Sequence, residues 1–169
     1  MSNIVIVIAE KDYQDKEYED TRAALEEAGH KILTRSSHVI AHGKFGGEVI
    51  IDLLTYDPHP MGAYDAIVLI GGSGCYQYFD DPEVRGLVKE FNDNGRIVAA
   101  ICAAPMILAN AGILKGKKAT CWDGEAENLQ KKGARYTGAD VEQDGNIITG
   151  NGPMAATAFG QKIAENLNS

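Results

Sequence analysis

The residue best suited to covalent chemistry in this sequence is Cys102, which joins an apolar run to a helical pattern in VAAICAAPMILANAG (residues 98–112). A thiol at a turn from a strand into a helix is close to backbone amides, which lower its pKa and can hold an oxyanion. Free cysteine is also among the most buried residue types, where it serves as a small hydrophobe. The residues alone leave both roles open.

Glycines that end another apolar run form a second candidate feature. The stretch YDAIVLIGGSG (residues 64–74) ends in Gly71, Gly72 and Gly74, where backbone amides can approach a ligand or another loop. Ligands of parallel α/β sheets bind beyond the carboxyl ends of the strands. We therefore expect this loop and Cys102 to face the same site.

Alternating strand and helix patterns position these two features. Apolar, largely β-branched runs predict strands over residues 4–9, 31–35, 66–70 and 97–101. Helical spacing with start and stop signals predicts helices over residues 17–28, 82–95 and 104–112, and the segment 117–167 adds strands and helices. Residues 39–55 predict a hairpin or a short excursion from the main sheet. The order predicts an α/β fold, a three-layer sandwich with a mainly parallel, flavodoxin-like central sheet.

Composition excludes several classes of protein. The chain has 169 residues, of which 44% are hydrophobic, and this predicts a single domain over residues 1–169. Its net charge of -8 disfavours nucleic acid as a partner. An odd number of cysteines, with no leader or membrane-length apolar run, predicts a cytoplasmic protein that does not bind membranes. We expect no metal or other cofactor, because no ligand spacing and no dinucleotide fingerprint is present.

The motifs resemble those of the ThiJ/PfpI superfamily, which includes the parkinsonism-associated deglycase and archaeal intracellular proteases and has the class I glutamine-amidotransferase-like fold. The stretches YDAIVLIGGSG, VAAICAAPMILANAGILKGKKATCW, GARYTG and VEQDGNIITGNGP follow in family order. The resemblance implies that Cys102 is the nucleophile at an elbow between strand and helix. It also implies that the amides of Gly71, Gly72 and Ala103 face the reacting oxygen, and that the chain forms a homodimer or a higher homo-oligomer.

Two family groups are interpreted as replaced. Counting back from Ala28 and Gly29 places Gln14 where members carry a glutamate, and an amide can support a thiolate but cannot carry a proton. Ala103 and Trp122 stand where members carry histidine. The four histidines of the chain map to neither place, and we expect all of them at the surface: His30, His38, His42 and His59.

Other side chains near the expected pocket have alternative roles. Asp123 and Glu125 are candidates for the missing base, or else helix caps. Cys75 and Cys121 are candidates for a resolving thiol, or else ordinary buried thiols. Trp122 either walls the pocket or packs. Tyr76 and Tyr78 either shape the mouth of the pocket or pack, and we expect packing.

Two functions follow as expectations. The resemblance implies a cysteine-dependent hydrolase or glyoxalase-type lyase in stress protection, whose substrates are reactive aldehydes, glycated groups, or small amides and peptides. The alternative is a non-catalytic redox sensor or holdase in which Cys102 oxidises to a sulfinate. An enzyme without the family glutamate and histidine would be weak, so the sequence does not decide whether this chain is an enzyme.

Overall fold

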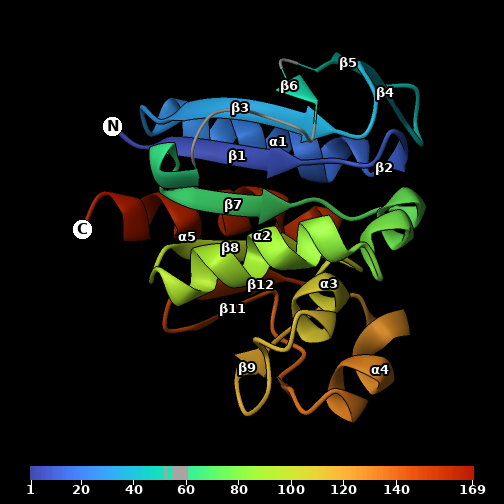
Figure 1. Ribbon diagram of the computed structural model, residues 1–169, viewed down its shortest axis with the longest axis vertical. Helices are drawn as coiled ribbons and strands as arrows, with labels where there is room; N and C mark the ends of the chain where they lie inside the picture. The colour runs from blue at the N-terminus through green and yellow to red at the C-terminus, as the bar shows by residue number, and fades with distance from the viewer. Residues whose placement is uncertain (52, 55–60) are drawn as a thin grey trace.

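The computed structural model describes residues 1–51, 53–54 and 61–169. Within them the main sheet has seven strands in the order β11-β12-β8-β7-β1-β3-β6. The strands are β1 (Asn3–Val7), β3 (Lys31–Ser36), β6 (Leu53–Leu54), β7 (Ala66–Leu69), β8 (Ile97–Ile101), β11 (Val141–Asp144) and β12 (Ile147–Gly150). Neighbouring strands are parallel except β11, which pairs antiparallel with β12. The predicted mainly parallel α/β fold is confirmed (Figure 1).

Helices cover both faces of this sheet (Figure 1). Helix α1 (Asp15–Glu27) packs against α5 (Ala156–Leu167) on one face, and α2 (Pro82–Asp93) packs against β7 and β8 on the other. Two helices of six residues, α3 (Pro105–Asn110) and α4 (Ala126–Lys131), follow β8 and β9. Because β1, β7 and β8 lie between the helical layers, nearly all of their side chains are buried, as their continuous apolar runs predict.

The predicted excursion forms a small separate sheet. Strands β2 (Lys11–Tyr13), β4 (Ile40–Gly43) and β5 (Glu48–Ile50) pair in the order β2-β4-β5, and β4 and β5 form a hairpin. A further pair joins β9 (Lys118–Ala119) with β10 (Arg135–Tyr136). The hairpin lies beyond the carboxyl ends of β1 and β3 (Figure 1). The last position of the predicted excursion, residue 55, lies outside the described residues, and so does His59.

No helix within the described ranges is long and apolar enough to cross a membrane. The same part of the chain holds no group of three or more His, Cys, Asp or Glu side chains arranged to bind a metal ion.

Candidate functional site

Cys102 directly follows β8 in a left-handed backbone conformation, with φ of 64°. Its own N–H donates to the carbonyl of Gly150 on β12, and its carbonyl accepts from the N–H of Trp122 at 2.7 Å. Two neighbouring segments therefore hold this turn in place, and the chain enters α3 three residues later. A non-glycine residue with positive φ is strained, and such residues gather at functional sites.

A buried carboxyl group accompanies the thiol, and it belongs to Glu17. This side chain has no exposed surface and lies beside Cys102, while its Oε2 accepts from the N–H of Gly71 at 2.9 Å. Burial raises the pKa of Glu17 from 4.5 to about 7, although its interactions with Cys102 and with the Gly71 amide act in the opposite direction. The carboxyl group therefore gains and loses its proton near neutral pH.

The interpretation that Gln14 replaces the carboxyl group is therefore wrong. Gln14 is the N-cap of α1, and its Oε1 accepts from the N–H of Glu17 at 2.9 Å. It lies at the edge of the cavity beside Cys102, three positions before the carboxyl group. Because Gln14 caps the first turn of the helix, it also fixes the backbone from which Glu17 projects.

The thiol differs from the expected thiolate. Burial is the largest cause and the Glu17 carboxyl group the next, and together they raise the pKa of Cys102 to about 12, although the amides of Gly72 and Ala103 act to lower it. A free Cys102 therefore keeps its proton at neutral pH, and ionisation requires a base. Glu17 is in position to be that base.

Two of the three amides expected to face the reacting atom do so. The N–H groups of Gly72 and Ala103 form hydrogen bonds with the Cys102 sulfur, but the N–H of Gly71 is taken by Glu17. A Cβ at Gly71 would lie 2.6 Å from the Cβ of Cys102 and 2.7 Å from the Glu17 carboxylate. Glycine at position 71 thus allows the thiol and the carboxyl group to approach each other.

A cavity of about 310 Å³ opens beside the thiol, and we refer to it as the Cys102 cavity. Residues from the start of α1, the β4–β5 hairpin, the glycine loop and the two turns around Cys102 and Trp122 line it: Gln14, Lys44, Phe45, Gly72, Ser73, Tyr76, Cys102, Ala103 and Trp122. Of these, the sequence analysis missed Lys44, Phe45 and Ser73.

The hairpin that contributes Lys44 and Phe45 is fastened by Asp15. This carboxylate is 7% exposed and accepts from the N–H groups of Phe45 at 2.8 Å and Gly47 at 2.6 Å. Charge-assisted hydrogen bonds to backbone amides are about twice as strong as neutral ones. Asp15 at the start of α1 thus ties the rim of the Cys102 cavity to the helix that holds Glu17.

The other candidate side chains have varied placements. Trp122 is 48% exposed and lines the cavity, so it is a wall residue. Asp123 is exposed and accepts from the Tyr136 hydroxyl at 2.9 Å, and it lines a neighbouring hollow rather than the Cys102 cavity. Glu125 is 6% exposed and accepts a hydrogen bond from Tyr76. Neither carboxylate lines the Cys102 cavity.

Cys75 and Cys121 are buried, and all three thiols are free. The Cys121 thiol donates to the carbonyl of Trp122 at 3.2 Å. The expectation that Tyr78 packs is met, since it is 2% exposed and donates to the carbonyl of Ile8. Tyr76, by contrast, lies at the cavity and is 42% exposed.

The placement of the histidines differs in one case from expectation. His38 and His42 are exposed, as predicted, and pair with Glu10 and Glu48. His30 is only 5% exposed, so its prediction as a surface residue is wrong. Its Nδ1 accepts from the N–H of Ser2, and burial lowers its pKa. None of these three rings lines the Cys102 cavity.

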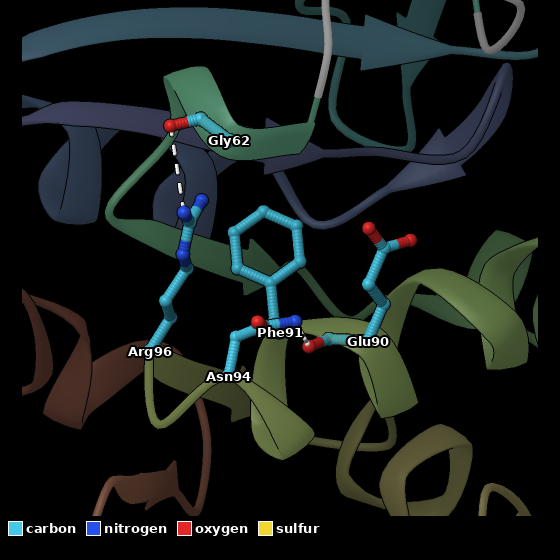
Figure 2. A pocket seen from close by; sticks show the side chains of 5 residues that line it. All are labelled: Gly62, Glu90, Phe91, Asn94 and Arg96. Carbon is cyan, nitrogen blue, oxygen red and sulfur yellow. Dashed lines mark hydrogen bonds between the residues drawn. The ribbon is translucent and has the colours of Figure 1, made fainter.

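A smaller hollow of about 100 Å³ lies at the opposite end of the strands, where Arg96 precedes β8 (Figure 2). The Arg96 guanidinium crosses the hollow and donates hydrogen bonds to the carbonyls of Gly62 and Tyr64. Its Cζ lies 6.0 Å from the centroid of the Phe91 ring. These contacts fix the loop before β7, and they give the hollow a structural role.

The chain is similar in sequence to several known proteins. A model of the DJ-1/PfpI family matches residues 2–166. An uncharacterized protein of Methanocaldococcus jannaschii is 39% identical over 166 residues, which are 96% of this chain and 80% of that protein. A Pyrococcus horikoshii protein named as a deglycase is 29% identical over 156 residues, 92% of this chain and 93% of that protein.

Solved structures give the same result. The ThiJ/PfpI domain protein from Brachyspira murdochii superposes with a TM-score of 0.94 at 36% identity, covering 98% of this chain and 96% of that one. DJ-1beta from Drosophila melanogaster has a TM-score of 0.88 at 27% identity, covering 99% and 91%. The chain belongs to the DJ-1/PfpI family.

Proposed function

We propose that this chain uses Cys102 as a nucleophile toward the carbonyl carbon of reactive aldehydes and of glycated amines or thiols. The observation that carries the proposal is the closeness of Cys102 and the buried carboxyl group of Glu17 on either side of Gly71, together with the pKa of that carboxyl group, which burial raises to about 7. Relatives named as deglycases support the substrate class.

The chemistry begins with a proton transfer. The Glu17 carboxylate takes the proton of the Cys102 thiol, and the sulfur forms a bond to the carbonyl carbon while the π electron pair of C=O moves to oxygen. The backbone amides of Gly72 and Ala103 point at the sulfur in the absence of substrate, and they can donate hydrogen bonds to that oxyanion. Protonated Glu17 then returns its proton to the oxygen, which completes a hemithioacetal.

A pKa of about 7 suits Glu17 to both halves of this exchange. General acid and base catalysis is most efficient when the pKa of the group lies near the working pH, and it contributes typically about 10²–10⁴-fold. The expected weakness of an enzyme without the family glutamate therefore does not apply to this chain. The place of the expected histidine is still taken by Ala103 and Trp122.

Oxidation of Cys102 is the second candidate, and one observation favours it. Cys102 is partly exposed, whereas Cys75 and Cys121 are buried. A peroxide that enters the cavity would therefore meet Cys102 first. The raised pKa of Cys102 slows both reactions, since the thiolate is the reactive form in each, and the relatives named as deglycases favour carbonyl chemistry.

The test measures release of the adduct from methylglyoxal-treated N-acetylcysteine by the wild-type chain, Cys102→Ser and Cys121→Ser. Cys121→Ser is the matched control, because its hydroxyl can keep the hydrogen bond to the Trp122 carbonyl outside the cavity. Release above the spontaneous rate of the adduct alone should disappear in Cys102→Ser and persist in Cys121→Ser. Release above that spontaneous rate in Cys102→Ser would refute the proposal.

A further inference from the structure

Tyr76 lines the Cys102 cavity, and a buried carboxylate holds its hydroxyl. Its hydroxyl donates to Oε1 of Glu125 at 2.6 Å. Glu125 is 6% exposed and lies outside the cavity, just beyond Trp122. The contact therefore joins two segments far apart in the sequence, both of which line the cavity.

The position of the Tyr76 hydroxyl is set from two directions. The ring of Tyr76 stacks on Phe79, with centroids 4.4 Å apart and an interplanar angle of 27°. The other carboxylate oxygen of Glu125, Oε2, accepts from Nδ2 of Asn128 at 2.8 Å. Because Asn128 holds the carboxylate and Phe79 holds the ring, the direction in which the phenolic proton points is fixed.

This arrangement decides what the hydroxyl can offer a ligand. A phenol carries one proton, and Tyr76 gives it to Glu125 in a charge-assisted hydrogen bond. Burial and the neighbouring carboxylate raise the pKa of Tyr76, so the proton stays in place through the neutral range. What remains on the oxygen is a lone pair, which accepts hydrogen bonds and donates none.

We propose that the Tyr76 hydroxyl, oriented by Glu125, is a specificity-determining acceptor that selects carbonyl substrates with an O–H or N–H donor within a few bonds of the carbon attacked by Cys102. The ligand class is α-hydroxy- and α-amino-carbonyl compounds. The inference rests on the proposed nucleophilic role of Cys102. Tyr76 and Cys102 line one cavity of about 310 Å³, so a ligand of a few carbon atoms reaches both. Glu125 is a positioning residue.

The experiment compares two aldehydes that differ in a donor, glycolaldehyde and methoxyacetaldehyde. Each adds to the Cys102 thiol as a hemithioacetal, in which the S–H proton ends on the carbonyl oxygen and nothing leaves. Adduct formation is read as protection of Cys102 from iodoacetamide, resolved by peptide mass spectrometry. For each variant, the preference for glycolaldehyde is the concentration of methoxyacetaldehyde that protects half of Cys102, divided by the corresponding concentration of glycolaldehyde. The two aldehydes also differ in size, and comparing this preference between variants cancels that difference.

Tyr76→Phe removes the hydroxyl and keeps the stacked ring. The wild-type preference for glycolaldehyde should exceed that of Tyr76→Phe by about tenfold, the effect of one good hydrogen bond. Tyr136→Phe is the matched control, since it also loses a tyrosine hydroxyl that donates to a carboxylate, Asp123, but lies outside the cavity. It should keep the wild-type preference.

Glu125→Gln tests the positioning role. The amide is isosteric with the carboxylate but holds the phenolic proton less firmly, so the preference for glycolaldehyde should fall toward the Tyr76→Phe value. An unchanged preference in Glu125→Gln would refute the role of Glu125.

The remaining outcomes separate the two proposals. Equal weakening of both aldehydes in Tyr76→Phe would mean that the residue only shapes the wall, which overturns the inference and leaves the nucleophilic role of Cys102 intact. If neither aldehyde protects Cys102 in the wild-type chain, the proposed function fails and the inference fails with it.

Discussion

Replacing Glu17 by Gln should make the folded chain more stable at alkaline pH while it slows the chemistry of Cys102. Glu17 has no exposed surface, and burial raises its pKa from 4.5 to about 7. Gln keeps the shape and an acceptor for the Gly71 amide but carries no charge. The substitution therefore separates the cost of burying a carboxylate from its use as a base.

The magnitude follows from the pKa. The folded chain keeps the Glu17 proton up to about pH 7, whereas the unfolded chain releases it near pH 4.5. The folded state thus binds more protons between these values, and its free energy of unfolding falls as pH rises through this window. At about 1.36 kcal/mol per pKa unit, the loss attributable to Glu17 is about 3 kcal/mol, complete above pH 7.

The assay is urea unfolding of wild type and Glu17→Gln at pH 4 and pH 8. The difference in unfolding free energy between the two chains should move in favour of Glu17→Gln by about 3 kcal/mol from the lower pH to the higher. Glu127→Gln is the control, because Glu127 is exposed and its pKa is lowered by Lys131. A difference that does not change with pH would refute the reasoning.

The same pair of chains tests the role of Glu17 as a base. Iodoacetamide labelling of Cys102 in the wild type should rise as Glu17 ionises near pH 7. In Glu17→Gln that inflection should vanish, because no carboxyl group beside Cys102 then changes its charge near pH 7. An inflection that survives the substitution would assign it to another group.

Three further substitutions, with Gly86→Ala as a control for the first, test how the site is held. Gly71→Ala should destabilise the folded chain and block labelling of Cys102, because the new Cβ would lie 2.6 Å from the Cys102 Cβ. Gly86→Ala places its Cβ in open space on α2, so it should raise the free energy of unfolding, measured by thermal unfolding, by about 0.5–1 kcal/mol. Asp15→Asn should speed hydrogen exchange at the amide of Phe45, and unchanged exchange there would contradict the role of Asp15 as the fastening of the rim. Gln14→Ala should lower the unfolding free energy by about 1 kcal/mol without moving the pH inflection of Cys102 labelling, and a moved inflection would return Gln14 to the proton pathway.

The fold could be predicted from local signals because each central strand reads as one apolar run. Residues 97–101 form β8 at the predicted bounds, and Asp81 with Pro82 starts α2 as predicted. The short strands were beyond such signals. β9 and β10 have two residues each and exist through pairing with each other, which leaves no periodic pattern in the sequence.

The site could be predicted in part, and Glu17 shows why only in part. Counting back along the helix from Gly29 placed Gln14 at the position where family members carry a glutamate. The missed signal is helical spacing: Glu17, Thr21 and Leu25 recur at intervals of four and are all buried in α1. A glutamate on the apolar face of a helix is costly unless it is neutral or bonded, so its position there indicates a function.

Other features depend on contacts between distant segments. His30 follows the glycine that ends α1, which reads as a surface turn, but the amino-terminal residues and α5 cover it. Lys44 and Phe45 are distant in sequence from Cys102, and the Asp15 carboxylate places them at its cavity. No pattern within one segment carries such information.

The left-handed backbone of Cys102 determines which substitution of this cysteine is least harmful to the stability of the fold. Its φ of 64° is a conformation that costs an L-residue about 1–2 kcal/mol and costs glycine nothing. Cys102→Gly would therefore relax the turn, whereas Cys102→Ala would keep its strain. A relative with glycine here would have exchanged reactivity for stability in one step. Family members with glycine at this position are therefore expected to retain the fold, and to unfold at a higher temperature than their cysteine revertants.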